Sequence, residues 1–234
     1  MNPKGKISDL FFSFQGEGIY AGEPQIFVRL AHCNISPRCS YCDTRIEKEK
    51  EMSAEEILSR IDRENWPTKF ISLTGGEPLL QTEFLEKFLT SLKKRKFRTY
   101  LETNGTLPEA LASVIDGVDI IAMDIKLPSS GRTRPFWDKH RQFLRLGKKK
   151  EIMIKVVVTG ETEESDLARA ISLVKEEAPS SPFILQPVTP STGRTYGGIK
   201  AIGEKRLQDF FGLCQQHLKN VLVIPQHHVI LGIK

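Results

Sequence analysis

The chain has 234 residues, of which 39% are hydrophobic and 27% charged, and it carries a formal net charge of +5 at pH 7. These values are typical of a soluble globular protein, and the length suits one well-buried domain over 1–234. No segment approaches about 18 consecutive apolar residues and the N-terminus lacks a secretory signal, so we expect a cytoplasmic protein without membrane contact.

Strands and helices alternate along the chain. Apolar, β-branched runs predict strands at 26–30, 70–75, 98–103, 119–126, 152–160, 182–188 and 220–225. Helical periodicity follows Ser53, which forms a capping-box pattern with Glu56. It recurs at 83–95, 108–115, 163–177 and 204–218. This alternation predicts an α/β fold of parallel βα units, arranged as a partial or closed barrel or as an open doubly wound sheet.

Two short basic runs lie at 93–98 and 148–150. Cations are favoured near the C-terminal ends of helices, so we interpret both runs as solvated helix ends. A nucleic-acid surface is the alternative interpretation. Because no nucleic-acid-binding motif accompanies the charge, we expect no direct nucleic-acid partner.

Polar or glycine-rich residues follow five successive predicted strands. The motifs are TGGEP (74–78), ETNG (102–105), DIK (124–126), TG (159–160) and QP (186–187). The carboxyl ends of parallel strands meet at one face, where α/β proteins bind their ligands. One such motif is explained by a turn alone. Five in succession predict one shared site.

Three of the four cysteines lie within ten residues, directly after the strand predicted at 26–30. Cys33, Cys39 and Cys42 form a C-x5-C-x2-C pattern. Three thiolates suit a 4Fe–4S cluster with one open iron, whereas closed zinc sites and ferredoxin clusters use four ligands. Cys214 lies in a predicted helix among apolar residues, where a buried free thiol is the usual state. A zinc knuckle stays open as an alternative on spacing alone.

These motifs resemble the radical S-adenosylmethionine (SAM) superfamily, in which an aromatic residue, here Tyr41, precedes the last cysteine and a GGE motif follows the next strand. Further motifs are SFQGEG (13–18), CDT (42–44), ETNGT (102–106), DIKLPSSG (124–131), LQPV (185–188) and PQHH (225–228). Their ordered set is similar to the 7-carboxy-7-deazaguanine synthase family over essentially the whole chain. The first cysteine gap is two residues longer than the usual superfamily spacing, which a loop absorbs while keeping its ends close.

The resemblance implies a partial parallel βα barrel of the radical SAM type. It also implies conversion of 6-carboxy-5,6,7,8-tetrahydropterin to 7-carboxy-7-deazaguanine with loss of ammonia, in queuosine or 7-deazapurine biosynthesis. The implied cofactors are one 4Fe–4S cluster, SAM and Mg²⁺. The implied partners are the pterin substrate and an external electron donor such as a flavodoxin or ferredoxin, and we expect a homodimer.

Site residues follow from the same motifs. The resemblance assigns the cluster to Cys33, Cys39 and Cys42, and magnesium to Thr44. It assigns SAM contacts to Tyr41, Cys42, Asp43, Gly75, Gly76, Glu77, Gly105, Asp124, Ile125, Lys126 and Gln186. It assigns substrate contacts to Phe14, Gln15, Gly16, Glu17, Arg29 and Thr103. The planar fork of an arginine suits a substrate carboxylate, and a carboxylate such as that of Glu17 suits the donor edge of a pterin.

Two other functions stay open. One is a radical SAM activase for a glycyl-radical enzyme, which shares the three cysteines and the GGEP motif. The other is a non-catalytic zinc or iron–sulfur module that contacts RNA through the lysine runs. His227 and His228 are interpreted either as part of a tail that closes over the substrate or as solvent-facing residues.

Overall fold

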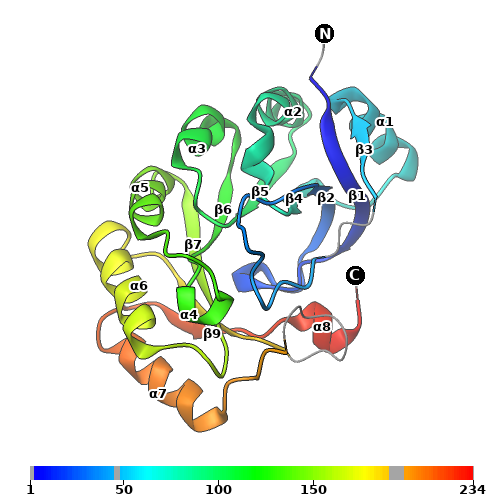
Figure 1. Ribbon diagram of the computed structural model, residues 1–234. Helices are drawn as coiled ribbons and strands as arrows, with labels where there is room; N and C mark the ends of the chain where they lie inside the picture. Colours follow the sequence, from blue (N-terminus) through cyan, green and yellow to red (C-terminus); the bar gives the residue numbers. More distant parts are fainter. Residues whose placement is uncertain (1–2, 45–47, 190–197, 234) are drawn as a thin grey trace.

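A curved sheet with helices around its outer face forms the centre of the molecule (Figure 1). The computed structural model describes residues 3–44, 48–189 and 198–233. The strands are β1 (Gly5–Phe14), β2 (Pro24–Leu30), β3 (Lys50–Met52), β4 (Phe70–Gly75), β5 (Arg98–Thr103), β6 (Ile120–Asp124), β7 (Glu151–Val158), β8 (Phe183–Pro187) and β9 (Val221–Val223). The α-helices are α1 (Ala54–Glu64), α2 (Thr82–Lys94), α3 (Pro108–Val114), α4 (Pro128–Gly131), α5 (Trp137–Gly147), α6 (Glu164–Glu177), α7 (Glu204–Gln215) and α8 (His227–Leu231). Short 3₁₀ turns are η1 (Gly18–Tyr20), η2 (Pro78–Gln81) and η3 (Ile115–Gly117).

The strands run in the order β3-β1-β2-β4-β5-β6-β7-β8-β9. From β2 to β9 every neighbouring pair is parallel, while β1 is antiparallel to both β2 and β3. Within the described residues β3 and β9 are the free edges of the sheet, so the barrel stays open. Its interior is called the lumen below. The predicted partial parallel barrel is confirmed, as are the seven predicted strands.

The sequence pattern missed β1 and β3. In β1 the register shifts between Ile7 and Asp9, and such a bulge interrupts the period-two alternation by which strands are recognised. β3 is a three-residue edge strand of the sequence KEM, too short and too polar for the same criterion. Both strands extend the parallel sheet at the side of β2.

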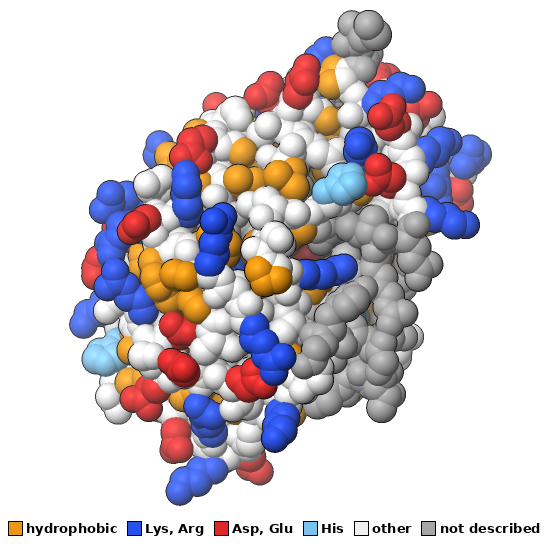
Figure 2. Space-filling view, viewed as in Figure 1, with side chains coloured by type: hydrophobic (Ala, Val, Ile, Leu, Met, Phe, Trp, Pro, Cys, Tyr) orange, Lys and Arg blue, Asp and Glu red, His pale blue; other side chains and the backbone are white. Residues whose placement is uncertain are grey.

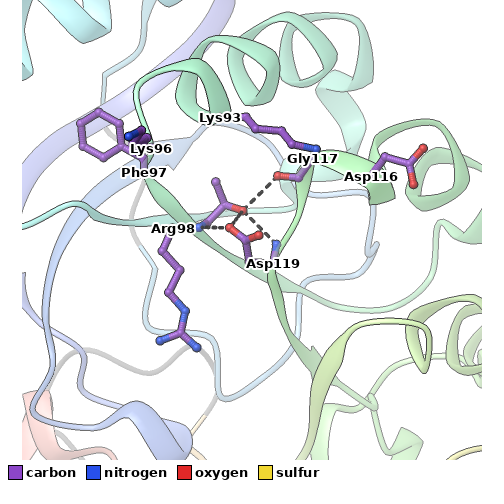
Figure 3. Close-up of a pocket in the computed structure, with 8 residues that line it drawn as sticks. Lys93, Lys96, Phe97, Arg98, Asp116, Gly117 and Asp119 are labelled. Carbon is purple, nitrogen blue, oxygen red and sulfur yellow. Dashed lines mark hydrogen bonds between the residues drawn. The ribbon is translucent and has the colours of Figure 1, made fainter.

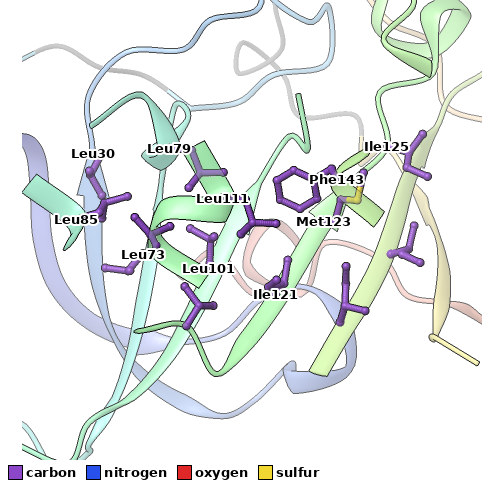
Figure 4. Packing of buried hydrophobic residues seen from close by; sticks show 14 of the residues in the cluster. Leu30, Leu73, Leu79, Leu85, Leu101, Leu111, Ile121, Met123, Ile125 and Phe143 are labelled. Atoms are coloured by element: carbon purple, nitrogen blue, oxygen red, sulfur yellow. The ribbon is translucent and has the colours of Figure 1, made fainter. Parts of the chain in front are cut away.

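The main core lies between the outer face of the sheet and the helices (Figure 4). Leu73 of β4, Leu101 of β5 and Ile121 of β6 are completely buried there and meet residues such as Leu85 of α2 and Phe143 of α5. Burial of one such side chain stabilises the fold by roughly 1.5–3 kcal/mol. This packing fixes the strands, so that the opposite faces of the same strands form a rigid wall around the lumen.

A smaller apolar cluster closes the amino-terminal end of the lumen. It contains Phe70, Tyr100, Ile120, Met153 and Ile184, from five adjacent parallel strands. Tyr20 of η1 packs edge-on against both Phe70 and Tyr100, with ring centroids 5.6 and 5.7 Å apart. Above this floor the lumen contains polar side chains such as Ser72, Glu102 and Lys155, so the carboxyl end is the candidate face for ligands.

Helix α1 begins with the predicted capping box. The Ser53 hydroxyl accepts from the Glu56 backbone N–H at 3.2 Å, and the Glu56 carboxylate accepts from the Ser53 N–H at 2.7 Å. We expect Ser53→Ala to lower the free energy of unfolding by about 1 kcal/mol, because it removes one of these two bonds. Denaturant unfolding of the purified protein measures this, and an unchanged midpoint would show that the cap is dispensable.

The basic runs occur at helix ends, as predicted. Lys93 and Lys94 close α2, and 148–150 directly follow α5. On the face shown in Figure 2, lysine and arginine side chains are interspersed with acidic ones and do not form one continuous patch. None of the helices in the described ranges has both the length and the apolar composition needed to cross a bilayer.

Candidate active site

The three cysteines lie on the loop that leaves β2 at the carboxyl end of the lumen. The Cys33 side chain is exposed, Cys39 is buried and Cys42 is intermediate. The loop is pinned where the Ser40 N–H donates to the Gly131 carbonyl and where the Ser40 hydroxyl donates to the Ser130 carbonyl. This part of the loop is therefore held against α4.

The thiols form a donor set that fits a 4Fe–4S cluster. Burial raises the pKa of Cys33 and Cys39. For both thiols the charge of Cys42 also raises the pKa, and the Lys126 ammonium lowers it. The described residues contain no group of three His, Cys, Asp or Glu side chains that would hold a single metal ion. The thiolates of a 4Fe–4S cluster bind different irons and do not need to converge on one point.

Gly75 and Gly76 pack the end of β4 against the start of the cysteine loop. A Cβ on Gly76 would lie 1.7 Å from the His32 carbonyl oxygen, and one on Gly75 would lie 2.0 Å from the Leu30 carbonyl oxygen. Gly75 also has a φ of +130°, which other residues rarely adopt. The Gly76 N–H donates to Leu30 and the Glu77 N–H to His32. The close approach made possible by these glycines is thus to the cysteine loop itself.

The Glu77 carboxylate is completely buried and already bonded within the protein. It accepts from the Leu79 N–H, the Thr103 hydroxyl and the Asn104 N–H at 2.7–3.1 Å. Burial raises the pKa of Glu77 to about 7, although these donors oppose the shift. The Glu77 N–H and carbonyl are also bonded, to His32 and Leu80, and the SAM contact of Glu77 stays a prediction. Likewise the Thr103 hydroxyl, predicted to contact substrate, donates to Glu77 and accepts from the Gly105 N–H.

Asn104, to which the sequence analysis gave no role, connects β5 to the cysteine loop. Its amide nitrogen donates to Asn34 Oδ1 at 2.9 Å and lies 3.9 Å from Cys33 Sγ. The next residue, Gly105, has a φ of +66°, and a Cβ there would strike the Met123 side chain at 2.5 Å. The ETNG motif thus positions the cysteine loop from the side of β5.

Charged side chains alternate across the lumen wall. Lys155 of β7 pairs with Glu17 and lies 3.7 Å from Asp124 Oδ2, and Asp124 pairs with Lys126 at 2.8 Å. The Lys126 ammonium also lies 5.3 Å from the centroid of the Tyr41 ring. The predicted substrate residue Glu17 and the predicted SAM residues Asp124, Lys126 and Tyr41 are therefore connected through one further cation, Lys155.

A second polar group surrounds Glu102 of β5. Its carboxylate accepts from Gln15 Nε2 at 2.9 Å, from Ser72 Oγ at 3.0 Å and from Thr74 Oγ1 at 2.6 Å. Gln15 Nε2 also donates to Gln25 Oε1, while Gln15 Oε1 accepts from the Glu17 N–H. Gln15 therefore orients the segment that leads from β1 to Glu17.

Arg29 projects into the lumen from β2, on the same face as Gln25 and Phe27. Its guanidinium lies 5.7 Å from the centroid of the Phe11 ring, which stacks on Phe27 at 5.1 Å. Within the described part of the chain no carboxylate forms an ion pair with Arg29, so its fork is available to an anionic ligand. This supports the role predicted for Arg29.

The C-terminal segment covers the segment that contains Gly16. The His227 N–H donates to the Gly16 carbonyl at 2.9 Å, and a Cβ on Gly16 would lie 2.4 Å from the His228 ring. Burial opposes protonation of His228, but the Asp43 and Glu17 carboxylates outweigh it and raise the His228 pKa. The His227 side chain is exposed to solvent, whereas His228 is partly buried against Gly16, so closure of this segment over a substrate stays a prediction.

The remaining predicted residues differ in what they present. The Ile125 side chain is completely buried in the main core, and its N–H donates to the Lys155 carbonyl. Gln186 lies in the lumen and donates to Glu17 Oε1 at 3.1 Å. Phe14 is 48% exposed at the end of β1, and Thr44 is half-buried at the end of the cysteine loop. All of these ligand contacts remain predictions.

Sequence reasoning missed Glu102 and Lys155. Lys155 was visible as the single charged residue of the apolar run IMIKVVV, and Glu102 as an acidic residue within the predicted strand RTYLET. A charge at such a position costs free energy unless it is paired, so it indicates a polar wall or a site. Gln226, which belongs to the PQHH motif but received no role of its own, donates to Glu17 at 3.1 Å.

A separate hollow of about 390 Å³ lies at the opposite end of the strands (Figure 3). Lys93, Lys96 and Arg98 line it together with Asp119, whose carboxylate accepts from the Thr99 N–H and hydroxyl. This end of β5 is remote from the cysteine loop, which follows the carboxyl end of β2. The hollow therefore belongs to a different face from the candidate active site.

The fold and the cysteine loop define a class of protein. The family model described as "Radical SAM superfamily" matches residues 30–171. The crystal structure of QueE from Escherichia coli is similar with a TM-score of 0.64 and 20% identity, covering 96% of this chain and 95% of that one. The chain is a member of the radical SAM superfamily.

Curated relatives narrow the class. A 7-carboxy-7-deazaguanine synthase of Geobacter sulfurreducens is 37% identical over 98% of this chain and 98% of its own length. One of Methanocaldococcus jannaschii is 32% identical over 97% and 99%. The chain therefore belongs to the 7-carboxy-7-deazaguanine synthase family.

Proposed function

We propose that this chain converts 6-carboxy-5,6,7,8-tetrahydropterin to 7-carboxy-7-deazaguanine and ammonia in queuosine or 7-deazapurine biosynthesis. The observation that carries the proposal is the position of Arg29, Gln15 and Glu17. All three lie in the lumen near its carboxyl end, where the cysteine loop is. Near full-length relatives of this activity support it. The substrate has the atomic composition of the product plus ammonia, so the conversion needs no net oxidant.

Cys33, Cys39 and Cys42 would bind a 4Fe–4S cluster, leaving one iron for SAM. When bound, the cluster and SAM supply a radical that removes the C6 hydrogen of the pterin before its ring contracts, and SAM is regenerated. The backbone of Gly75–Glu77 and the Asp124–Lys126 segment would face SAM. The Thr44 hydroxyl would give Mg²⁺ one hard oxygen ligand, and substrate and water would supply the others.

This chain's residues would bind and orient the substrate. The Arg29 guanidinium would pair with the substrate carboxylate, and the Phe11 ring lies 5.7 Å from it. Glu17 would accept from the N–H groups at the pterin's donor edge. Burial would raise the pKa of Glu17, but Lys155 and His228 oppose this and lower it to about 2, so the carboxylate stays ionised at neutral pH.

The proposal also includes an electron donor and an oligomeric state. An external one-electron donor such as a flavodoxin or ferredoxin would reduce the cluster. The free edges at β3 and β9 support a homodimer, because unpaired edges favour association. Residues 1–234 would act as one radical SAM domain.

Anaerobic turnover tests the function. The protein is reconstituted with iron and sulfide, reduced and given SAM, and 5′-deoxyadenosine and 7-carboxy-7-deazaguanine are quantified with and without the carboxypterin. We expect the deazaguanine to form only when the carboxypterin is present. SAM cleavage without that product would contradict the proposed carboxypterin substrate and favour the alternative function, activation of a glycyl-radical enzyme. Absence of both cluster and cleavage would reject the radical chemistry.

Arg29→Ala should weaken carboxypterin binding roughly 100-fold, because it leaves the substrate carboxylate without its charged partner. The affinity for SAM should stay within about twofold. Equilibrium titration of the unreduced protein with each ligand measures both values. Arg98→Ala, which alters an exposed arginine at the other end of the strands, is the matched control. Equal losses of affinity for the pterin and for SAM would show that Arg29 has a structural role and does not bind the substrate.

A further inference from the structure

Lys155 is a cation in the wall of the lumen that belongs to none of the predicted cluster, SAM or substrate contacts. It lies in the middle of β7, beside Asp124 in the neighbouring strand, and only 18% of its side chain is exposed. The next lumen residues on β7 are Met153 below and Val157 above, both apolar. A lysine at such a position costs free energy unless it forms compensating interactions.

The Lys155 ammonium spans two parts of the site. It donates to Glu17 Oε2 in the segment after β1, and it lies 3.7 Å from Asp124 Oδ2 at the end of β6. Asp124 has its own cation, Lys126, at 2.8 Å. Glu17 has Lys155 as its direct ion-pair partner in the described residues. Removal of Lys155 would therefore leave Asp124 paired and Glu17 unpaired.

The surroundings of Glu17 show what Lys155 controls. Gln186 of β8 and Gln226, just before α8, both donate to Oε1, while Lys155 occupies Oε2. His228 is the other cationic neighbour that lowers the Glu17 pKa, and it is itself hydrogen-bonded toward Asp43. Both glutamines are neutral. The two glutamines orient Oε1, whereas Lys155 orients Oε2 and is the cation that bonds directly to the Glu17 carboxylate.

We propose that Lys155 is a positioning residue for the pterin: it holds the Glu17 carboxylate ionised and aimed at the substrate's N–H donor edge. This inference rests on the proposed function. The inference assigns Lys155 to substrate binding through Glu17. The other carboxylate near Lys155, that of Asp124, belongs to the predicted SAM contacts. A protonated Glu17 would lose acceptor capacity toward the pterin, which is the loss that Lys155 prevents.

The first experiment compares Lys155→Met, Lys155→Arg and the control Lys139→Met, which alters an exposed lysine of α5 paired with Glu109. The affinities for carboxypterin and SAM are measured on the unreduced protein. During turnover we measure KM, kcat and the ratio of 5′-deoxyadenosine to deazaguanine. We expect Lys155→Met to weaken pterin binding and raise KM roughly tenfold or more, with SAM affinity within about twofold. Lys155→Arg should recover most of the loss, and the control should match the unaltered protein.

The pH profile separates this role from a merely structural one. In Lys155→Met the effect of burial on Glu17 is still opposed by His228 and Gln226 but no longer by Lys155, so the Glu17 pKa rises. Below that pKa the carboxylate becomes neutral, and kcat/KM for the pterin should fall as the pH is lowered. The unaltered protein should not show this fall in kcat/KM at low pH. Any fall caused by titration of His228 should appear in both the variant and the unaltered protein. Superimposable profiles would overturn the proposal.

A double variant keeps the test informative if Lys155→Met folds poorly. Lys155→Met combined with Glu17→Gln removes both charges, so no unpaired buried ion remains. If Lys155 acts through Glu17, the double variant and Glu17→Gln alone should show the same KM. An additional loss in the double variant, or an equal loss of SAM affinity, would overturn the proposal. Deazaguanine formation by the unaltered protein tests the function separately.

Discussion

Replacement of Cys33, Cys39 or Cys42 with alanine should abolish SAM cleavage, whereas Cys214→Ala should leave it intact. Three thiolates are the minimum that retains a 4Fe–4S cluster with one open iron, so each loss removes an anchor that no other group replaces. The three thiols share one loop, which Ser40 and the backbone of Gly76 and Glu77 hold in place. Iron content, cluster absorbance and 5′-deoxyadenosine yield measure the effect.

Cys214 is the matched control because the structure excludes it from the site. It is completely buried in α7, on the outer side of the sheet, and burial raises its pKa to about 12. A thiol with that pKa stays protonated, while a metal ligand must be a thiolate. Cys214→Ala should cost about 1 kcal/mol of stability through a small cavity. Loss of cluster loading in Cys214→Ala would disprove the three-ligand site.

Much of the site was accessible from the sequence because parallel strands fix where their ends meet. Once 70–75, 98–103 and 119–126 were identified as strands, the motifs after them had to converge. The elements that were missed depend on long-range packing. The bulge in β1 disrupts its pattern, and the Glu17–Lys155 pair joins residues 138 positions apart, for which no local rule exists.

Some predicted ligand-binding side chains already have protein partners. Glu77 and Thr103 were assigned to ligands on motif position, yet they bond to each other and to backbone N–H groups. A motif shows which residues are used together but not which of them touch the ligand. Glu102 illustrates the converse, since it organises Gln15 without belonging to any assigned contact.

Gly76→Ala should destabilise the protein by about 3–5 kcal/mol and prevent cluster assembly. The added methyl would sit 1.7 Å from the His32 carbonyl oxygen, and a backbone atom cannot rotate away as a side chain does. Relief requires β4 and the cysteine loop to separate, which breaks the bonds from Gly76 to Leu30 at 3.1 Å and from Glu77 to His32 at 2.8 Å. Cys33, the residue after His32, then loses its position.

Gly212→Ala is the control, because a Cβ at Gly212 in α7 would meet nothing within 4 Å. Alanine is favoured over glycine inside a helix, so this variant should be stabilised by about 0.5–1 kcal/mol with full iron content. Thermal unfolding and iron per chain are compared for both variants. A Gly76→Ala protein with normal iron content would mean that the loop tolerates displacement from β4. The glycine would then serve the ligand's approach, and the SAM affinity of that variant should fall instead.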